Sequence, residues 1–204
     1  MKSIITVILL ITINGGLISQ PERPVDEAHG LTVGSVAPIF SALDADSNLF
    51  NSKDALIKGP IVMIFYRGFW CPVCNRHLGK IQDSLKLITE KGAVVIAVSP
   101  EKPEFLDKMS EKTGAQFTLL YDEDYKIADA YDVTFKPTSI EIFSYNFVGA
   151  KLKETHSDDS QRLPIPATYI ISQDGKIAWR QFDPNYKNRS TVNDILMALD
   201  KIIH

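Results

Sequence analysis

The sequence predicts an α/β fold in which a central mixed sheet is flanked by helices. Two observations carry this prediction: apolar, strand-like runs alternate with helical patterns, and a hairpin follows near the end of the chain. The apolar runs are rich in β-branched and aromatic residues, as in strands buried on both faces. They lie at residues 60–66, 93–98 and 117–121. Because strands that alternate with helices build βαβ units, we expect these three strands to be parallel.

Helical patterns follow the apolar runs. The first begins beside Cys71 and extends to about residue 91, with apolar residues at helical spacing. Further helices are expected over residues 103–112 and 126–131, and an amphipathic helix over residues 191–203 closes the chain. The Cys71 segment therefore lies at the junction between a buried strand and the helix that follows it.

The later part of the chain departs from this alternation. Residues 135–162 become polar toward their end and are interpreted as an insertion or loop that borders the functional site. The runs at 168–172 and 176–180 are joined by Gln173-Asp174-Gly175, a Gly-containing turn that predicts a hairpin. An antiparallel hairpin added to parallel strands makes the expected sheet mixed.

The N-terminus indicates export. Met1-Lys2 gives a positive start, and residues 4–13 form an apolar run shorter than the roughly 20 residues of a membrane anchor. We expect a signal peptide at residues 1–19, a flexible linker at 20–30 and one domain at 31–204; a buried strand or an anchor is the alternative for the apolar run. The mature protein is then extracytoplasmic, in the periplasm or secreted, without stable membrane insertion.

Composition and charge exclude several function classes. The 204 residues are 45% hydrophobic and 23% charged, as in ordinary globular domains. A formal net charge of -3 offers no excess of cations to hold nucleic acid. Four scattered histidines and two cysteines do not supply the second ligand pair of a zinc site, so no metal and no other cofactor is expected.

The two cysteines, Cys71 and Cys74, are separated by Pro72 and one further residue. This spacing lets the sulfurs close a disulfide with little backbone movement, and beside a βαβ pattern it indicates redox chemistry. A helix N-terminus lowers the pKa of a thiol, and Pro72 suits the first helical turn. Arg67 is a nearby cation that stabilises a thiolate or remains at the surface; His77 is interpreted as a solvated helical residue in preference to a thiolate partner.

Four segments of the chain resemble the AhpC/TSA peroxiredoxin-like family of the thioredoxin superfamily. This resemblance implies a thioredoxin-like fold, an antioxidant role, and a redox-active center that forms a disulfide bond. The segments are Gly-Ser-Val-Ala-Pro-Ile-Phe at 34–40, Phe-Tyr-Arg-Gly-Phe-Trp-Cys-Pro-Val-Cys at 65–74, Leu163–Ile171, and Asp-Pro-Asn-Tyr at 183–186.

The resemblance also implies roles for residues outside the cysteine segment. In thioredoxin-like folds a cis-proline stands against the cysteine pair, and Pro166 is similar to it in placement. The backbone N–H and C=O of Ile165 would then dock an extended substrate. The alternative is an ordinary trans proline that starts an edge strand.

The chain departs from the peroxiredoxin pattern at three positions. Aligning the peroxidatic cysteine on Cys74 places Cys71 on an expected Thr, Arg67 on an expected Pro, and Pro166 on an expected Arg. Trp70 and the Cys-x-x-Cys pair instead resemble thiol–disulfide oxidoreductases. The sequence thus combines features of two kinds of redox enzyme.

Three functional hypotheses follow. In a thiol peroxidase, Cys74 attacks a peroxide, Cys71 resolves the sulfenic acid, and a thioredoxin-like dithiol reduces the resulting disulfide. In an extracytoplasmic thiol–disulfide reductase, Cys71 attacks a protein disulfide and Cys74 resolves the mixed disulfide. In a non-catalytic binding module the cysteines are incidental. Family likeness favours the peroxidase over the reductase, and both over the module.

Overall fold

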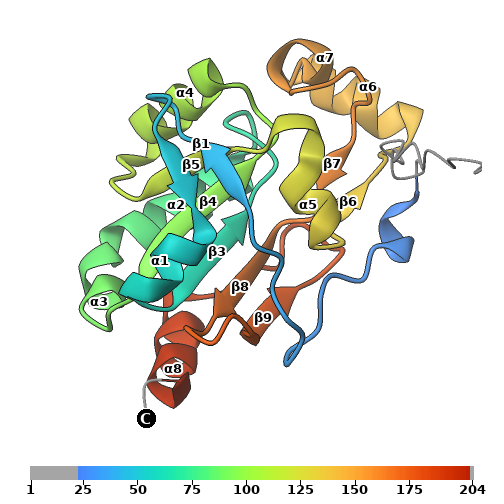
Figure 1. The fold of residues 1–204 in the computed structure, drawn as a ribbon. Coiled ribbons are helices and arrows are strands. Elements are labelled where there is room, and N and C mark those ends of the chain that lie inside the picture. Colours follow the sequence, from blue (N-terminus) through green and yellow to red (C-terminus); the bar gives the residue numbers. More distant parts are fainter. Residues whose placement is uncertain (1–22, 203–204) are drawn as a thin grey trace, which may run out of the picture.

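The computed structural model describes residues 23–202 and has the predicted α/β architecture (Figure 1). The central sheet has the strand order β5-β4-β3-β8-β9. Its strands are β3 (Ile61–Phe65), β4 (Val94–Ser99), β5 (Thr118–Tyr121), β8 (Ala167–Ile171) and β9 (Ile177–Phe182). β3, β4 and β5 run parallel, whereas β8 is antiparallel to both β3 and β9. The predictions of a mixed sheet, of three parallel strands and of the hairpin are confirmed.

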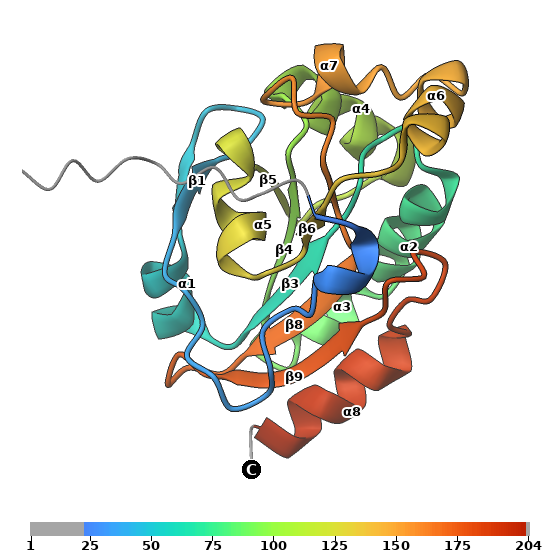
Figure 2. The same ribbon diagram turned by 90° about the vertical axis from the view of Figure 1, so that its right-hand side faces the viewer.

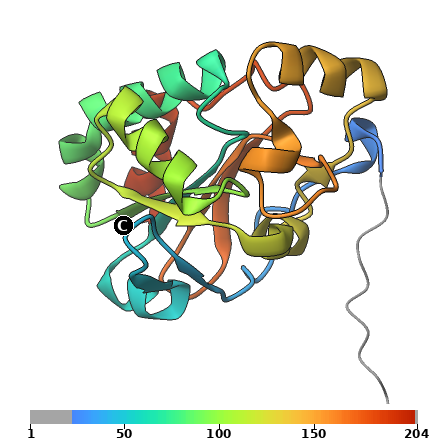
Figure 3. The ribbon, with the colours of Figure 1, turned by 90° about the horizontal axis from the view of Figure 1, so that it is seen from above.

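Helices cover both faces of this sheet (Figures 2 and 3). One face packs against α2 (Pro72–Asp83), α3 (Leu85–Thr89), α4 (Pro103–Thr113) and α8 (Val192–Ile202). The other face packs against α1 (Ser52–Lys58) and α5 (Lys126–Ala130). Side chains of β3 alternate between the two hydrophobic cores, Ile64 toward α2 and Met63 toward α1. Burial on both faces explains why this strand is a continuous apolar run.

Residues 41–58 form elements that the sequence pattern left unassigned. β1 (Ser41–Leu43) and β2 (Leu49–Asn51) pair as an antiparallel hairpin, which leads into α1. The Asn51 side chain caps α1 by accepting hydrogen bonds from the backbone N–H groups of Lys53 and Asp54. A short 3-10 helix, η2 (Glu123–Tyr125), precedes α5.

The segment interpreted as an insertion or loop contains two helices. β6 (Thr134–Phe135) and β7 (Leu163–Pro164) pair at its base, and α6 (Ser139–Phe147) and α7 (Leu152–Thr155) lie between them. A capping box starts α6, because Thr138 and Glu141 bond each other's backbone N–H groups. These helices project at one end of the sheet (Figure 1).

The first described residues pack against the domain. Arg23 forms an ion pair with Asp132, Ala28 is only 2% exposed, and the short helix η1 (Val25–Glu27) lies between them. The expectation of a flexible linker is therefore wrong for residues 23–30, because their side chains find polar and apolar partners beside β6. The predicted signal peptide, residues 1–19, lies outside the described residues. Between residues 23 and 202, no helix is long and apolar enough to cross a membrane.

Candidate active site

The turn between β3 and α2 positions both cysteines. Cys71 is the N-cap of α2, with φ -87° and ψ 107°, and Pro72 occupies the first turn, where its missing N–H costs nothing. The backbone N–H of Cys71 donates to the carbonyl of Gly68 at 3.1 Å, which closes the turn. Cys74 lies in the first turn of the helix. The prediction that the cysteine pair opens a helix is confirmed.

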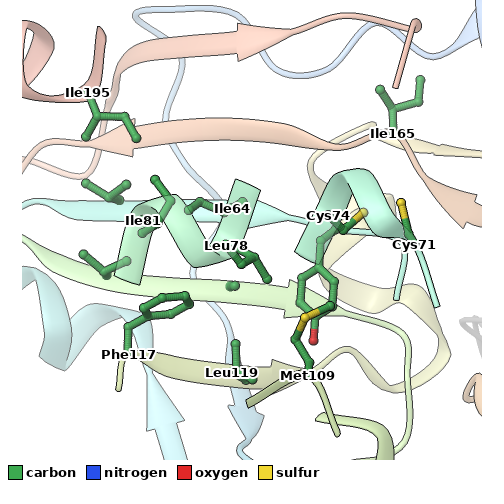
Figure 4. Close-up of a cluster of buried hydrophobic side chains, with 14 of the residues drawn as sticks. Ile64, Cys71, Cys74, Leu78, Ile81, Met109, Phe117, Leu119, Ile165 and Ile195 are labelled. Atoms are coloured by element: carbon green, nitrogen blue, oxygen red, sulfur yellow. The ribbon is translucent and has the colours of Figure 1, made fainter. Parts of the chain in front are cut away.

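Both cysteines carry free thiols and are fully buried. Figure 4 shows them at one end of the hydrophobic cluster, on the side of Ile165. A hydrogen bond from the Cys74 side chain lowers the pKa of Cys71 to about 5 in spite of its burial, and the Arg67 charge and the Cys74 backbone N–H add to this shift. Burial raises the pKa of Cys74, and so does its hydrogen bond to Cys71. These shifts favour the thiolate on Cys71 and the thiol on Cys74, whereas the peroxidase hypothesis from the sequence has Cys74 as the attacking thiolate.

Arg67 is held against Cys71 by aromatic rings. Its Nη2 lies 3.9 Å from Cys71 Sγ, and its Nη1 donates to the Tyr145 hydroxyl at 3.3 Å. The guanidinium carbon lies 5.0 Å from the ring centroid of Trp70, 4.8 Å from that of Tyr145 and 4.0 Å from that of Tyr186. Such cation–π contacts fix a cation that is only 3% exposed. Arg67 thus contacts Cys71, Trp70 contacts Arg67, and the alternative of a surface position for Arg67 is wrong.

Arg189 is a second arginine at the site, and sequence reasoning missed it. Its Nη2 lies 3.6 Å from Cys74 Sγ, and its Nε donates to the backbone carbonyl of Tyr186 at 2.7 Å. The residue comes from the segment between β9 and α8, far from the cysteines in sequence. Nothing in its local sequence marks it except that it follows the Asp-Pro-Asn-Tyr segment of the family resemblance. Arg67 therefore lies beside the sulfur of Cys71, and Arg189 lies beside the sulfur of Cys74.

The buried acid Glu101 is hydrogen-bonded to the turn between β3 and α2. Glu101 is fully buried, and its Oε2 accepts the backbone N–H of Phe69 at 2.8 Å. Burial raises the pKa of Glu101 well above its ordinary value, which favours the uncharged carboxyl. Gly68 has φ +152°, and a Cβ there would lie 2.4 Å from Glu101 Oε1 and 2.5 Å from Trp70 Nε1. Only glycine fits at this point of the turn.

His77 is neither solvated nor in contact with a thiolate. It is 7% exposed, and its Nε2 lies 3.1 Å from the backbone oxygen of Ser190 and 3.2 Å from the Ser190 hydroxyl. Burial, together with the charge of Arg189, lowers the pKa of His77 to about 4. The ring is neutral at pH 7 and ties α2 to the segment before α8. The interpretation as a solvated helical residue is wrong.

The expected docking strand is already occupied by the protein itself. Among the described residues there is no cis peptide bond, so the prediction of a cis Ile165-Pro166 bond is wrong. The N–H of Ile165 donates to the carbonyl of Val133 at 2.6 Å, and both Ile165 and Pro166 are buried. The reason is that β6 and β7 pair as a two-stranded antiparallel sheet, and the hydrogen bond from Ile165 to Val133 continues this pairing. Ile165 therefore has no free backbone N–H for a substrate.

The fold and this site define a thiol-dependent oxidoreductase of the thioredoxin fold. The family model of the AhpC/TSA family matches residues 33–180, and the chain belongs to this family. No group of three or more His, Cys, Asp or Glu side chains that could hold a metal ion occurs in the described part of the chain.

Comparisons with individual proteins agree with this membership. The chain is 28% identical over 153 residues to "Putative peroxiredoxin Rv2521" of Mycobacterium tuberculosis, which covers 75% of this chain and 86% of that protein. It is 33% identical over 104 residues to peroxiredoxin Bcp of Escherichia coli, covering 50% of this chain and 65% of Bcp. The crystal structure of peroxidoxin BcpB from Mycobacterium tuberculosis superposes with a TM-score of 0.66 at 18% identity, over 84% of this chain and 98% of that one.

Proposed function

We propose that the protein is a thiol peroxidase with an antioxidant role, which reduces hydroperoxides through a Cys71/Cys74 dithiol–disulfide cycle. The observation that carries this proposal is the position of Cys71, at a helix start with Arg67 Nη2 3.9 Å from its sulfur and with its pKa lowered by Cys74 and Arg67. Membership of the AhpC/TSA family and the similarity to peroxiredoxins support peroxide as the substrate.

The first step of the cycle is attack by the Cys71 thiolate on one peroxide oxygen. The O–O bond breaks, Cys71 becomes a sulfenic acid, and the other oxygen leaves as alkoxide or hydroxide and takes a proton. Arg67 offers a fixed cation beside the sulfur where charge shifts in the transition state. Since both cysteines are fully buried, a peroxide reaches them only when the side chains that cover them move.

The second step is resolution by Cys74. Its sulfur attacks the Cys71 sulfenic acid, a disulfide forms, and water leaves. Cys74 must lose its proton in this step, and Arg189, at 3.6 Å, stabilises the thiolate that develops. An external dithiol of the thioredoxin type then exchanges with the disulfide, so that the donor is oxidised and both thiols are restored.

The competing function, reduction of protein disulfides, has less support. An extended substrate would need a free strand edge beside the cysteines, but the Ile165 N–H is bonded to Val133. One purified preparation should therefore be compared on hydrogen peroxide, an alkyl hydroperoxide and a protein disulfide, with a thioredoxin-type donor. We expect reductant-dependent consumption of peroxide far faster than by a free thiol. Peroxide consumption at the rate of a free thiol, together with rapid reduction of the protein disulfide, would overturn the proposal.

We also propose that the protein acts outside the cytoplasm after removal of residues 1–19. The positive start and the apolar run at residues 4–13 support this proposal, as does the break that follows them. Mass spectrometry of the native protein is expected to find a mature N-terminus near Gln20. An intact Met1 on protein recovered from the cytosol would contradict it.

A further inference from the structure

The helix α6 is apolar on two opposite sides, although it lies at the edge of the molecule (Figure 2). Its inner side includes Tyr145, whose ring packs against Trp70. Its outer side carries Ile140, Phe143 and Phe147, which are 82%, 72% and 84% exposed. The spacing i, i+3, i+7 places these three side chains in one stripe along the helix. Val148 directly follows Phe147 and is exposed as well. We call the residues Ile140, Phe143, Phe147 and Val148 the outer face of α6.

A helix with two apolar sides is normally buried in a protein. In contrast, α6 has no buried residue. Within α6 the charged residue is Glu141, which lies off the stripe and bonds Thr138 at the helix start. The stripe is therefore apolar and aromatic along its whole length. Depletion of charge and enrichment of aromatic residues are typical of the buried centre of a protein–protein interface.

The size of the outer face indicates what covers it. A Phe side chain presents roughly 150–250 Å², so Phe143 and Phe147 together expose roughly 230–390 Å² at their exposed fractions. Ile140 and Val148 bring the apolar surface to on the order of 500 Å². A monomer rarely exposes a contiguous apolar surface larger than this. Two such faces bury on the order of 1,000 Å² in total, which is the lower limit for a specific interface.

A two-fold symmetric pair matches the outer face to itself. When two copies of α6 lie antiparallel, Ile140 of one copy is opposite Phe147 of the partner subunit, and the two Phe143 side chains meet near the axis. The N-terminal segment of the same chain is the competing cover. After the proposed removal of residues 1–19, only Gln-Pro-Glu at residues 20–22 precedes the described chain. Such a short, polar segment does not cover an apolar face.

We propose that the outer face of α6 is the interface of a reversible homodimer of this chain. The inner side of the same helix carries Tyr145, whose hydroxyl accepts a hydrogen bond from Arg67 at 3.3 Å. Burial of the outer face stabilises α6, and with it the contact that helps to hold Arg67 beside Cys71. The interface therefore lies next to the active site but contains neither cysteine. The inference concerns assembly and does not depend on the substrate.

Sedimentation velocity across the micromolar range tests this interface on the purified protein, with the N-terminus that it has in the cell. An interface of this size predicts a Kd on the order of micromolar, because small interfaces form weak complexes. The wild-type protein should therefore pass from monomer to dimer as its concentration rises. Phe143→Gln/Phe147→Gln should weaken the dimer about 100-fold or more, since burial of one Phe corresponds to about tenfold or more. Both positions are exposed and Gln is a good helix former, so the fold should survive.

Two further variants make the test specific. Ile140→Gln, a single change on the outer face, should weaken the dimer about tenfold. Ile57→Gln/Leu87→Gln removes two exposed apolar side chains from α1 and α3 and is the matched control, which should keep the wild-type dimer.

Three results would overturn the inference. The first is a wild-type protein that stays monomeric across the micromolar range, and the second is a dimer that Phe143→Gln/Phe147→Gln leaves intact. The third is a monomer that binds phospholipid vesicles through Phe143 and Phe147, which would assign the outer face to a membrane.

Discussion

Replacing Arg67 by methionine removes the cation nearest to the Cys71 thiolate. Arg67 Nη2 lies 3.9 Å from Cys71 Sγ, and at an effective dielectric of about 20 two unit charges at that distance attract by about 4 kcal/mol. Hydrogen bonds to charged groups contribute about 1.5–3 kcal/mol net, and one pKa unit corresponds to about 1.4 kcal/mol. Arg67→Met is therefore expected to raise the pKa of Cys71 from about 5 by roughly one to two units. The Cys74 donor remains, so the pKa should stay below the ordinary value of 9.0.

The far-ultraviolet absorbance of the thiolate, followed against pH in the reduced protein, measures this shift without requiring a reagent to reach the buried sulfur. Arg67→Lys is the matched control, since it keeps a positive charge and should shift the titration less. Near-ultraviolet circular dichroism should show that the aromatic rings around the site remain ordered in both variants. A midpoint that stays at the wild-type value in Arg67→Met would refute the role given to this arginine.

Three further predictions concern the same site. Arg189→Met should slow closure of the disulfide by roughly tenfold or more, since one fixed hydrogen-bond donor can contribute on the order of 100-fold to a rate. Counting the free thiols in samples quenched at successive times measures this rate, and an unchanged rate would exclude a role of Arg189 in resolution. The peroxide reaction should rise with pH as Cys71 deprotonates, with a midpoint near its pKa of about 5, because the thiolate is the nucleophile; a midpoint near 9.0 would contradict this. Gly68→Ala should destabilise the protein by about 1–3 kcal/mol in denaturant unfolding, because its Cβ would overlap Glu101. Gly79→Ala, with nothing within 4 Å of its Cβ, is the control and should not destabilise it.

The parts of the fold that the sequence predicts are those encoded locally. The β3 and β4 runs are continuous and apolar because both faces of these strands are buried, and the hairpin is marked by its Gly175 turn. The Cys71/Cys74 pair is likewise local, since the residues that place it at a helix start are its own neighbours. By contrast, the β1–β2 hairpin has short strands of three residues each with one buried residue between them, Ala42, which leaves little periodic signal.

The rest of the site depends on tertiary packing. Arg189 reaches Cys74 only because the chain folds back from β9, and Glu101 reaches the backbone of Phe69 from the end of β4. No sequence pattern links residues that lie so far apart along the chain. The expectation for Ile165 failed for the same reason: its backbone N–H donates to the carbonyl of Val133, which directly precedes β6, a strand that the sequence did not predict.

Which cysteine is the stronger acid is also a property of the folded protein. Alignment to the peroxiredoxin pattern assigned the first attack to Cys74. In the fold, however, Cys71 holds the N-cap and the side chain and backbone of Cys74 lower its pKa, whereas burial raises the pKa of Cys74. Hydrogen-bond direction and burial cannot be derived from spacing alone.

The central claim is that Cys71 attacks the peroxide and Cys74 resolves the product. It is tested most directly by treating the single variants Cys74→Ser and Cys71→Ser with one equivalent of hydrogen peroxide in the presence of dimedone, which traps sulfenic acids. Mass spectrometry should find the dimedone adduct on Cys71 of Cys74→Ser, while Cys71→Ser stays unmodified. An adduct on Cys74 of Cys71→Ser, with Cys74→Ser inert toward peroxide, would contradict the account.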